Sequence, residues 1–447
     1  MSATINRISA LLLLAFVLLA GALGLIVSNG PSLVAREDNP RPILTERRIP
    51  RGRILDRHGE IIVESIPDDG FYTRRTRYPN AAPFAGYYSI NYGTSGVEQA
   101  FDSTLRGTLG LDPVQARVND LLHLNPIGHA VQLTIDLSAQ RLADSLLGHR
   151  TGAVVVLSVP DGDLLALSSH PTFDPNTLDE QWDALRADLS APLLNRATQG
   201  QYQPGTALQP ILLGEALRRE AVTLDDTPEF PAMPFRIDAR TLACRDEAGI
   251  VTLADAFRSA CPGPFADLGP LLGGSTFEEI VVTWGLTETN VVGVQGAQPI
   301  TSSFALTDTQ ALRQFAVGQG PLTVTPLHMA LAASTLAAHG ELRPPRIVSA
   351  TESIDGVWKP FARSAATRLL PANIADQVVA AMPHTDDLAW HAGEGLSGSS
   401  RLRWFIGLAP IDRPRYAVVV LIEDPADATA GHPAIEIGQA LLAALSR

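Results

Sequence analysis

An uncharged stretch near the amino terminus most constrains how this chain can fold. Ile8 to Val27 is a run of 20 residues without a charged side chain. A helix of this length matches the ~30 Å hydrocarbon core of a bilayer, whereas the apolar core of a secretory signal usually has only about 7 to 15 residues. The run predicts an uncleaved transmembrane anchor. Ala20-Gly21-Ala22 also fits a cleavage site, which leaves a signal peptide as the alternative.

Bulk composition excludes several classes of function. The chain has 447 residues, enough for two or three domains, and its 45% hydrophobic and 18% charged residues are typical of a globular protein. A net charge of -13 without a basic stripe argues against a nucleic-acid surface. Neither H-E-x-x-H nor C-x-x-C occurs, so we expect no metal and no cofactor.

Lysine and cysteine are both rare. The single lysine, Lys359, lies in D-G-V-W-K-P, which predicts a surface turn between strands. Lysine-dependent chemistry, such as P-loop phosphate binding, Schiff bases and Ser/Lys pairs, is therefore excluded unless Lys359 serves it. Cys244 and Cys261 form either one disulfide or two buried thiols.

The rest of the chain predicts an α+β protein. After the anchor (residues 1–29) we expect a small β-rich stalk or pedestal domain (30–150), with an extended, proline-containing segment at 31–50 and a hairpin at His58-Gly59. The main domain (151–447) begins and ends with strand pairs. Its expected strands are 152–158, 164–168, 404–410 and 416–423.

Helical signals dominate between these hairpins. They include a helix capped by Thr325 with Pro326 in its first position, while other helices are expected from Asp136 to Gly148 and at 433–446. Strands at both ends with helices between them predict one antiparallel sheet, closed by the two termini of the domain and flanked by helices.

The segment Q-P-G-T-A-L-Q-P, residues 203–210, has the form of a nucleophile turn. Its Pro-Gly pair delivers Thr206 to the first turn of an apolar helix, close to backbone N–H donors and to the positive end of the helix dipole. Gln209, three residues later, lies on the same helical face. An amide side chain cannot act as a base near neutral pH, so the turn lacks a proton acceptor.

In the order of its motifs the chain resembles the class B penicillin-binding proteins, the membrane-anchored D,D-transpeptidases that cross-link peptidoglycan. The resemblance covers nearly the whole chain. The motifs that carry it are R-G-R-I-L-D-R-H-G (51–59), Y-G-T-S-G-V-E (92–98), V-Q-L-T-I-D (131–136), G-A-V-V-V-L-S (152–158), H-P-T-F-D-P-N (170–176), P-L-L-N-R-A (192–197), G-Q-G-P-L-T-V-T-P-L-H-M-A (318–330) and W-F-I-G-L-A-P (404–410).

The resemblance implies a penicillin-binding-protein transpeptidase fold held in the cytoplasmic membrane by one helix, with the C-terminal part outside. The arginines that flank the anchor oppose this orientation: Arg7 precedes it, whereas Arg36, Arg41 and Arg47 follow it. Implied partners are membrane proteins of cell-wall synthesis or peptidoglycan strands.

Three active-site motifs of that family can be placed by their flanks, and all three are altered. S-x-x-K, which supplies the nucleophile and its activating lysine, becomes Thr206 and Gln209. S-x-N becomes Ala260-Cys261-Pro262, and K-T-G becomes Leu396-Ser397-Gly398. Because general-base assistance typically contributes about 10²- to 10⁴-fold, we expect a catalytically inactive scaffold or regulator.

Two alternatives stay open. An active D,D-transpeptidase or hydrolase would use Thr206 with a relocated base, for which Asp174, His391 and Glu394 are the candidates. A non-catalytic ligand binder would have retained the cleft for stem peptides.

Overall fold

The computed structural model describes residues 2–34, 41–112, 114, 118–119, 121–122, 124–288, 306, 308–425, 427 and 431–447. The chain divides into two compact units. One comprises residues 1–49 with 67–73, and the other comprises residues 50–66 with 74–447.

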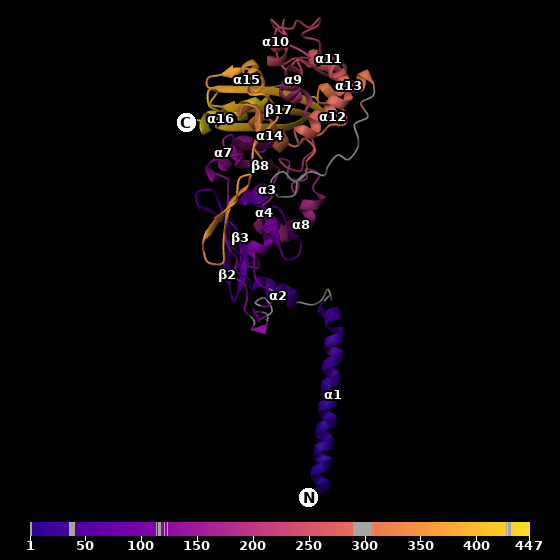
Figure 1. Cartoon of the computed structure of the whole chain (residues 1–447), viewed down its shortest axis with the longest axis vertical. Helices are drawn as coiled ribbons and strands as arrows, with labels where there is room; N and C mark the ends of the chain where they lie inside the picture. Colours follow the sequence, from indigo (N-terminus) through magenta and orange to yellow (C-terminus); the bar gives the residue numbers. More distant parts are fainter. Residues whose placement is uncertain are drawn as a thin grey trace. The chain divides into compact units, whose positions relative to one another are not determined.

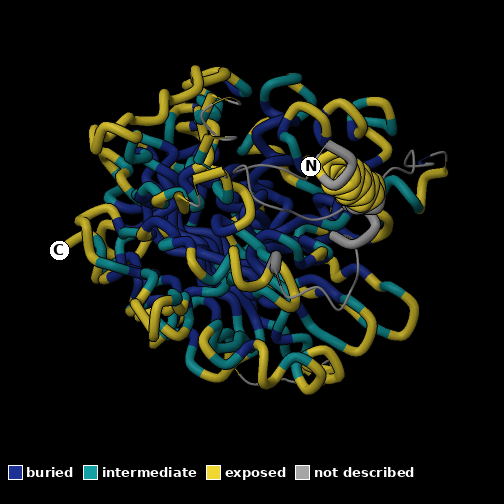
Figure 2. Tube along the Cα trace, turned by 90° about the horizontal axis from the view of Figure 1, so that it is seen from below, coloured by how far each residue is buried: buried dark blue, intermediate teal, exposed yellow. Residues whose placement is uncertain are grey.

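The first unit carries the predicted apolar helix. Helix α1 (Ser2–Val34) contains the span Ile5–Leu25, which has a mean hydropathy of 2.6 and is long and apolar enough to cross a membrane. Figure 2 shows this helix exposed, as expected for a surface that faces lipid. The following segment is not wholly extended as predicted, because α2 (Arg41–Arg47) is helical and proline is tolerated in a first helical turn. Residues 35–40 of that predicted stalk lie outside the described residues.

A six-stranded sheet follows the anchor in sequence, with strand order β13-β12-β6-β1-β2-β3. The predicted hairpin at His58-Gly59 is confirmed, since β1 and β2 pair antiparallel and Gly59 has a φ of 85°. Lys359 lies in strand β13 rather than in the predicted turn, because the D-G turn comes earlier and residues 358–360 pair with β12. The strands are β1 (Ile54–Leu55), β2 (Ile61–Asp68), β3 (Phe71–Thr76), β6 (Val131–Leu133), β12 (Val348–Glu352) and β13 (Trp358–Pro360).

Short elements lie between β3 and β6. They are η1 (Pro79–Ala81), α3 (Ala82–Ala85), β4 (Tyr88–Ser89), β5 (Gly93–Thr94), α4 (Gly96–Ala100) and α5 (Asp102–Leu105). Strands β4 and β5 form a small antiparallel pair.

The main sheet has the order β15-β16-β17-β18-β7-β8. Strand β18 pairs antiparallel with β7, for example Val419 with Val155, so the end of the domain closes onto its beginning as the sequence predicts. The strands are β7 (Gly152–Ser158), β8 (Leu164–His170), β15 (His384–Thr385), β16 (Leu388–Ser397), β17 (Ser400–Ala409) and β18 (Tyr416–Pro425).

Helices cover both faces of this sheet (Figure 1). Val154 and Val156 point to one core with α7 (Leu137–Leu147) and α16 (Pro433–Leu445), whereas Val155 points to the other core with α14 (Pro326–Ala337). This alternation follows from the two-residue period of a strand.

Two predicted helix starts are confirmed by their caps. The Asp136 side chain accepts hydrogen bonds from the backbone N–H groups of α7, and Thr325 forms a reciprocal capping box with His328 at the start of α14. Capping satisfies backbone donors that a helix start otherwise leaves without partners.

The remaining elements fill the space between the hairpins. They are η2 (Pro175–Thr177), α8 (Leu178–Ala187), η3 (Gly205–Leu208), α9 (Gln209–Arg218), β9 (Phe235–Ile237), β10 (Arg240–Leu242), α10 (Leu253–Arg258), α11 (Pro262–Leu272), α12 (Gly274–Thr283), α13 (Thr309–Ala316), β11 (Glu341–Leu342), β14 (Thr367–Arg368) and α15 (Ala372–Ala381). Of these, η3 carries the candidate nucleophile and packs on strand β16.

Candidate active-site cleft

The predicted nucleophile turn packs directly on strand β16. Gly205 has a φ of 58°, and a Cβ atom built on it would lie 1.9 Å from the carbonyl oxygen of Glu394. Only glycine allows both this backbone conformation and this close approach. The turn therefore delivers Thr206 to the start of the buried η3–α9 helical segment, where its side chain is 2% exposed.

Thr206 is fixed by two hydrogen bonds from β16. Its Oγ1 accepts from the backbone N–H of Glu394 at 2.9 Å, and its carbonyl oxygen accepts from His391 Nε2 at 3.1 Å. Between these contacts, a Cβ on Gly393 would lie 2.2 Å from the backbone nitrogen of Ala207. The strand segment that faces Thr206 is thus residues 391–394.

This register corrects the predicted place of the third motif. Leu396, Ser397 and Gly398 do not face Thr206, because they lie at the hairpin end, where Ser397 pairs with Ser400 and Gly398 has a φ of 51°. The flanking motif W-F-I-G-L-A-P does not fix this position, because the hairpin of β16 and β17 extends to the Ser397–Ser400 pair. The facing segment, His391-Ala392-Gly393-Glu394, also lacks lysine.

The structure does bring the first and second motif positions together. Gln209 is fully buried, and its Nε2 donates to the carbonyl oxygen of Cys261 at 2.8 Å. Its Oε1 has no hydrogen-bond partner among the described residues. The flanking Ala260 and Pro262 carry no polar side chain, so nothing on them replaces the hydroxyl and amide of S-x-N.

A disulfide crosses this part of the cleft. Cys244 is bonded to Cys261, with their Cα atoms 4.1 Å apart. Of the two alternatives for the cysteines, the disulfide is the correct one. It ties the second-motif segment to the loop that follows β10.

Three side chains were candidates for a relocated base. Burial lowers the pKa of His391 to about 3, its ring stacks on Phe257 at 4.8 Å between centroids, and its Nε2 is bonded to the Thr206 carbonyl rather than to the hydroxyl. The Glu394 carboxylate is bound by Arg401 and, at 2.6 Å, by Arg403.

Asp174 caps η2 by accepting from the backbone N–H of Asn176. Among the described residues, none of the three candidate side chains hydrogen-bonds the Thr206 hydroxyl.

A cavity of about 430 Å³ opens beside Thr206. Three guanidinium groups line this cavity, those of Arg245, Arg401 and Arg403. His432 also lines it, and burial lowers the pKa of this histidine to about 4. Guanidinium groups bind carboxylates well but do not accept protons at neutral pH. The cleft offers guanidinium groups to an anion, and no side chain among the described lining residues hydrogen-bonds the Thr206 hydroxyl.

Sequence reasoning missed these arginines. Arg401 and Arg403 alternate along β17 and so share one face, and Glu394 is the direct cross-strand partner of Arg403. The R-L-R spacing ahead of W-F-I-G-L-A-P was the available signal. It could be interpreted only with the correct hairpin length.

Comparisons with known proteins agree with this architecture. Residues 152–387 match the penicillin binding protein transpeptidase domain, and residues 51–126 match the penicillin binding protein A dimerisation domain. Peptidoglycan D,D-transpeptidase PbpA of Mycolicibacterium smegmatis is 29% identical over 491 residues, covering 100% of this chain and 99% of the relative. PbpA of Mycobacterium tuberculosis strain H37Rv is 28% identical over 490 residues, covering 99% of each chain.

A solved structure of a related protein is also similar to this chain in fold and sequence. Penicillin-binding protein A from M. tuberculosis, solved as a ceftriaxone acyl-enzyme complex, matches with a TM-score of 0.80 and 26% identity, covering 90% of this chain and 100% of that one. The transpeptidase model alone spans more than half of the present sequence. This chain belongs to the penicillin-binding protein transpeptidase family, whose members act in peptidoglycan synthesis, and it carries an N-terminal apolar helix that fits a single-pass membrane anchor.

Proposed function

We propose that this chain is a non-catalytic penicillin-binding-protein homologue that serves peptidoglycan synthesis as a membrane-anchored scaffold or regulator. One observation carries the proposal. Gln209, at the position of the family's activating lysine, donates its amide to the Cys261 carbonyl and offers no basic nitrogen to Thr206. A secondary hydroxyl without a base has roughly the reactivity of a free alcohol, and general-base loss alone costs about 10²- to 10⁴-fold.

The charges of the cleft support the same proposal. Arg403 is held between Glu394 at 2.6 Å and Asp424 at 2.6 Å, and Arg401 also binds Glu394. These guanidinium groups stay protonated at neutral pH, so they cannot replace the lysine as proton acceptors. The single lysine, Lys359, lies on β13 of the other six-stranded sheet.

The competing proposal is a working transpeptidase or hydrolase that uses Thr206. Of the three candidate bases, His391 is the one whose side chain hydrogen-bonds Thr206, and its Nδ1 has no hydrogen-bond partner among the described residues. The lowered pKa keeps that imidazole neutral, but its other nitrogen is fixed on the Thr206 carbonyl and not on the hydroxyl. The bond to the carbonyl therefore favours a positioning role over a catalytic one.

Retained binding without turnover is a second candidate function. The cavity of about 430 Å³ lies within the ~300 to 1,000 Å³ typical of ligand sites, and Arg245 offers a cation to a peptide carboxylate. Titration with a D-Ala-D-Ala peptide tests this function. Saturable binding that weakens in Arg245→Ala supports it, and absence of saturation contradicts it while leaving the scaffold proposal intact.

Orientation and partners also belong to the proposal. The C-terminal unit is placed outside the cytoplasmic membrane, where it would meet cell-wall synthesis proteins or peptidoglycan strands. We divide the chain functionally into the anchor (1–29), a pedestal (30–150) and a transpeptidase-like domain (151–447). Protease treatment of intact spheroplasts tests the orientation, because a chain digested only after lysis would contradict it.

The activity test is release of D-alanine from a D-Ala-D-Ala peptide by the full-length chain. We expect the rate to match that of the Thr206→Ala variant. A clear rate that disappears in Thr206→Ala would establish the enzymatic alternative, and a further loss in His391→Gln would identify its base.

A further inference from the structure

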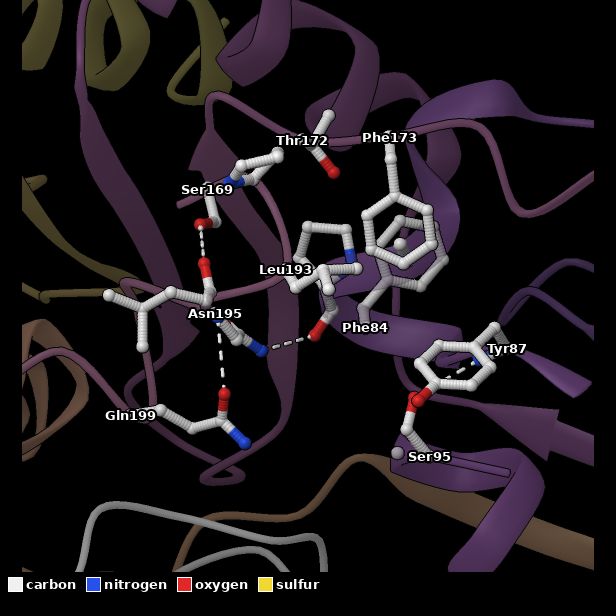
Figure 3. A pocket seen from close by; sticks show the side chains of 14 residues that line it. Phe84, Tyr87, Ser95, Ser169, Thr172, Phe173, Leu193, Asn195 and Gln199 are labelled. Carbon is white, nitrogen blue, oxygen red and sulfur yellow. Dashed lines mark hydrogen bonds between the residues drawn. The ribbon is translucent and has the colours of Figure 1, made fainter. Parts of the chain in front are cut away.

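A second cavity lies apart from the Thr206 cleft and shares no lining residue with it. It encloses about 220 Å³ between residues 82–96 on one side and two loops within residues 169–199 on the other (Figure 3). Parts of both loops lie in the motifs 170–176 and 192–197 that carried the family resemblance.

One wall of this cavity is aromatic. The rings of Tyr87 and Phe173 meet edge to face, with their centroids 5.9 Å apart. Trp182 supports Tyr87 at 6.5 Å, and Tyr92 stacks on Trp182 at 4.3 Å with an interplanar angle of 13°. Tyr87 and Phe173 therefore line the cavity, and Trp182 and Tyr92 pack in sequence behind Tyr87. Figure 3 shows Tyr87 and Phe173 across from Asn195 and Gln199, with Thr172 beside Phe173 and Ser95 beside Tyr87.

The facing wall carries the amide side chains of Asn195 and Gln199 among the apolar residues Pro192, Leu193 and Leu194. Asn195 Nδ2 donates to the Pro83 carbonyl at 2.7 Å, and the Asn195 backbone N–H donates to Gln199 Oε1 at 3.2 Å. Gln199 Nε2, Thr172 Oγ1 and the Tyr87 hydroxyl have no hydrogen-bond partner within the described part of the chain. Three polar groups are thus available to a ligand, beside aromatic rings.

The charge of the cavity limits what it can bind. Among the described residues that line it, none is Asp, Glu, Lys, Arg or His. A peptide stem with several carboxylates would find no cation there, and a phosphorylated ligand would find none either. A neutral ligand with one apolar face and several hydroxyl or amide groups fits this lining.

We propose that this cavity binds one pyranose ring of an N-acylated amino sugar, as found in a glycan strand. The C–H face of the ring packs on Tyr87 and Phe173, where aromatic surface contributes dispersion contacts. The hydroxyl and acetamido groups bind Gln199 Nε2 and Thr172 Oγ1. The volume, below the ~300 Å³ of the smallest drug-sized sites, matches a single sugar ring better than a longer oligomer.

The inference deepens the proposed function by assigning a chemical class to one partner, the glycan strand. It depends on the role in peptidoglycan synthesis for the source of the sugar, and it does not depend on whether Thr206 is inactive. A neutral sugar site of this kind would hold a glycan strand while the Thr206 cleft is empty or occupied.

The test is a titration of the full-length chain with tri-N-acetylchitotriose, followed by saturation-transfer NMR and calorimetry. The detergent must carry no sugar headgroup, since a maltoside would compete. We expect saturable binding with a dissociation constant of roughly 1 mM, as suits one ring in a small site. Maltotriose, which lacks acetamido groups, should bind at least fivefold more weakly.

Two variants and a control make the result specific. Tyr87→Ala should weaken binding at least tenfold, and Thr172→Val, which keeps the side-chain shape, should weaken it about threefold to tenfold. Trp358→Ala removes an exposed aromatic residue from β13 and should leave binding unchanged.

Three results would each overturn the proposal. They are binding that does not saturate, binding by Tyr87→Ala and Thr172→Val that is as tight as that of the wild type, and displacement of the sugar by an acidic stem peptide. Labelling of Thr206 by a β-lactam would refute only the proposal that Thr206 is catalytically inactive. It would not bear on the proposal of a sugar site.

Discussion

Acidification should destabilise this protein through His391, the imidazole fixed beside the candidate nucleophile. Its side chain is 0% exposed, and burial lowers its pKa from 6.5 to about 3. Between these two pH values the unfolded chain holds a proton on His391 that the folded chain does not. Stability therefore rises with pH across this window, is complete above about pH 6.5 and falls as the pH drops below it.

The size of the effect follows from the shift. One proton contributes about 1.4 kcal/mol per pH unit, so lowering the pH from 6.5 to 5.0 should cost about 2 kcal/mol through His391 alone. His432, whose pKa burial lowers to about 4, adds a separate loss in the same direction. The loss assigned to His391 must therefore be isolated with a variant.

The assay is guanidinium unfolding of the full-length chain at pH 7.5 and pH 5.0, followed by tryptophan fluorescence. His391→Gln keeps an N–H donor for the Thr206 carbonyl and removes the titrating ring, so its pH-dependent loss should be about 2 kcal/mol smaller than that of the wild type. The exposed His339→Gln is the matched control for removing one imidazole. Equal pH dependence in the wild type and His391→Gln would refute the reasoning.

Three further predictions concern the cleft. Replacing both Cys244 and Cys261 by serine opens a loop with a sequence separation of 17 and should lower the free energy of unfolding by about 3 kcal/mol relative to the oxidised wild type, measured by denaturant titration, and the reduced wild type should match the variant. Gly393→Ala places a Cβ 2.2 Å from the Ala207 nitrogen and should cost about 3 kcal/mol in the same assay, so a cost under 1 kcal/mol would contradict this packing. Gln209→Leu leaves the buried Cys261 carbonyl without its 2.8 Å donor and should cost about 1 to 3 kcal/mol, whereas an unchanged unfolding midpoint would show that the hydrogen bond contributes nothing.

Local signals predicted much of the fold. The strands β7 and β18 were evident from runs of β-branched residues, and helix α14 from the N-cap at Thr325 followed by Pro326, because such signals lie within a few residues of each other. The Pro-Gly turn likewise placed Thr206 at a helix start. These features depend on the conformational preferences of neighbouring residues, which can be inferred from the sequence alone.

The features that the sequence did not predict depend on contacts between residues that are far apart in the chain. The register of β16 against β17 sets whether Leu396 or His391 lies near Thr206, and the polar S-G-S-S segment marks neither the end of one strand nor the start of the other. A register is fixed by the whole set of cross-strand contacts. The same holds for the disulfide, since the approach of Cys244 to Cys261 depends on how two loops fold together.

The central claim is that Thr206 does not act as a nucleophile, and acylation by a β-lactam tests it most directly. The full-length chain is incubated with a fluorescent penicillin beside Thr206→Ala, with penicillin-binding protein A of M. tuberculosis, whose acyl-enzyme has been seen, as the positive control. We expect no covalent label above that of Thr206→Ala. A stoichiometric label that is present in the wild type and absent from Thr206→Ala would contradict it.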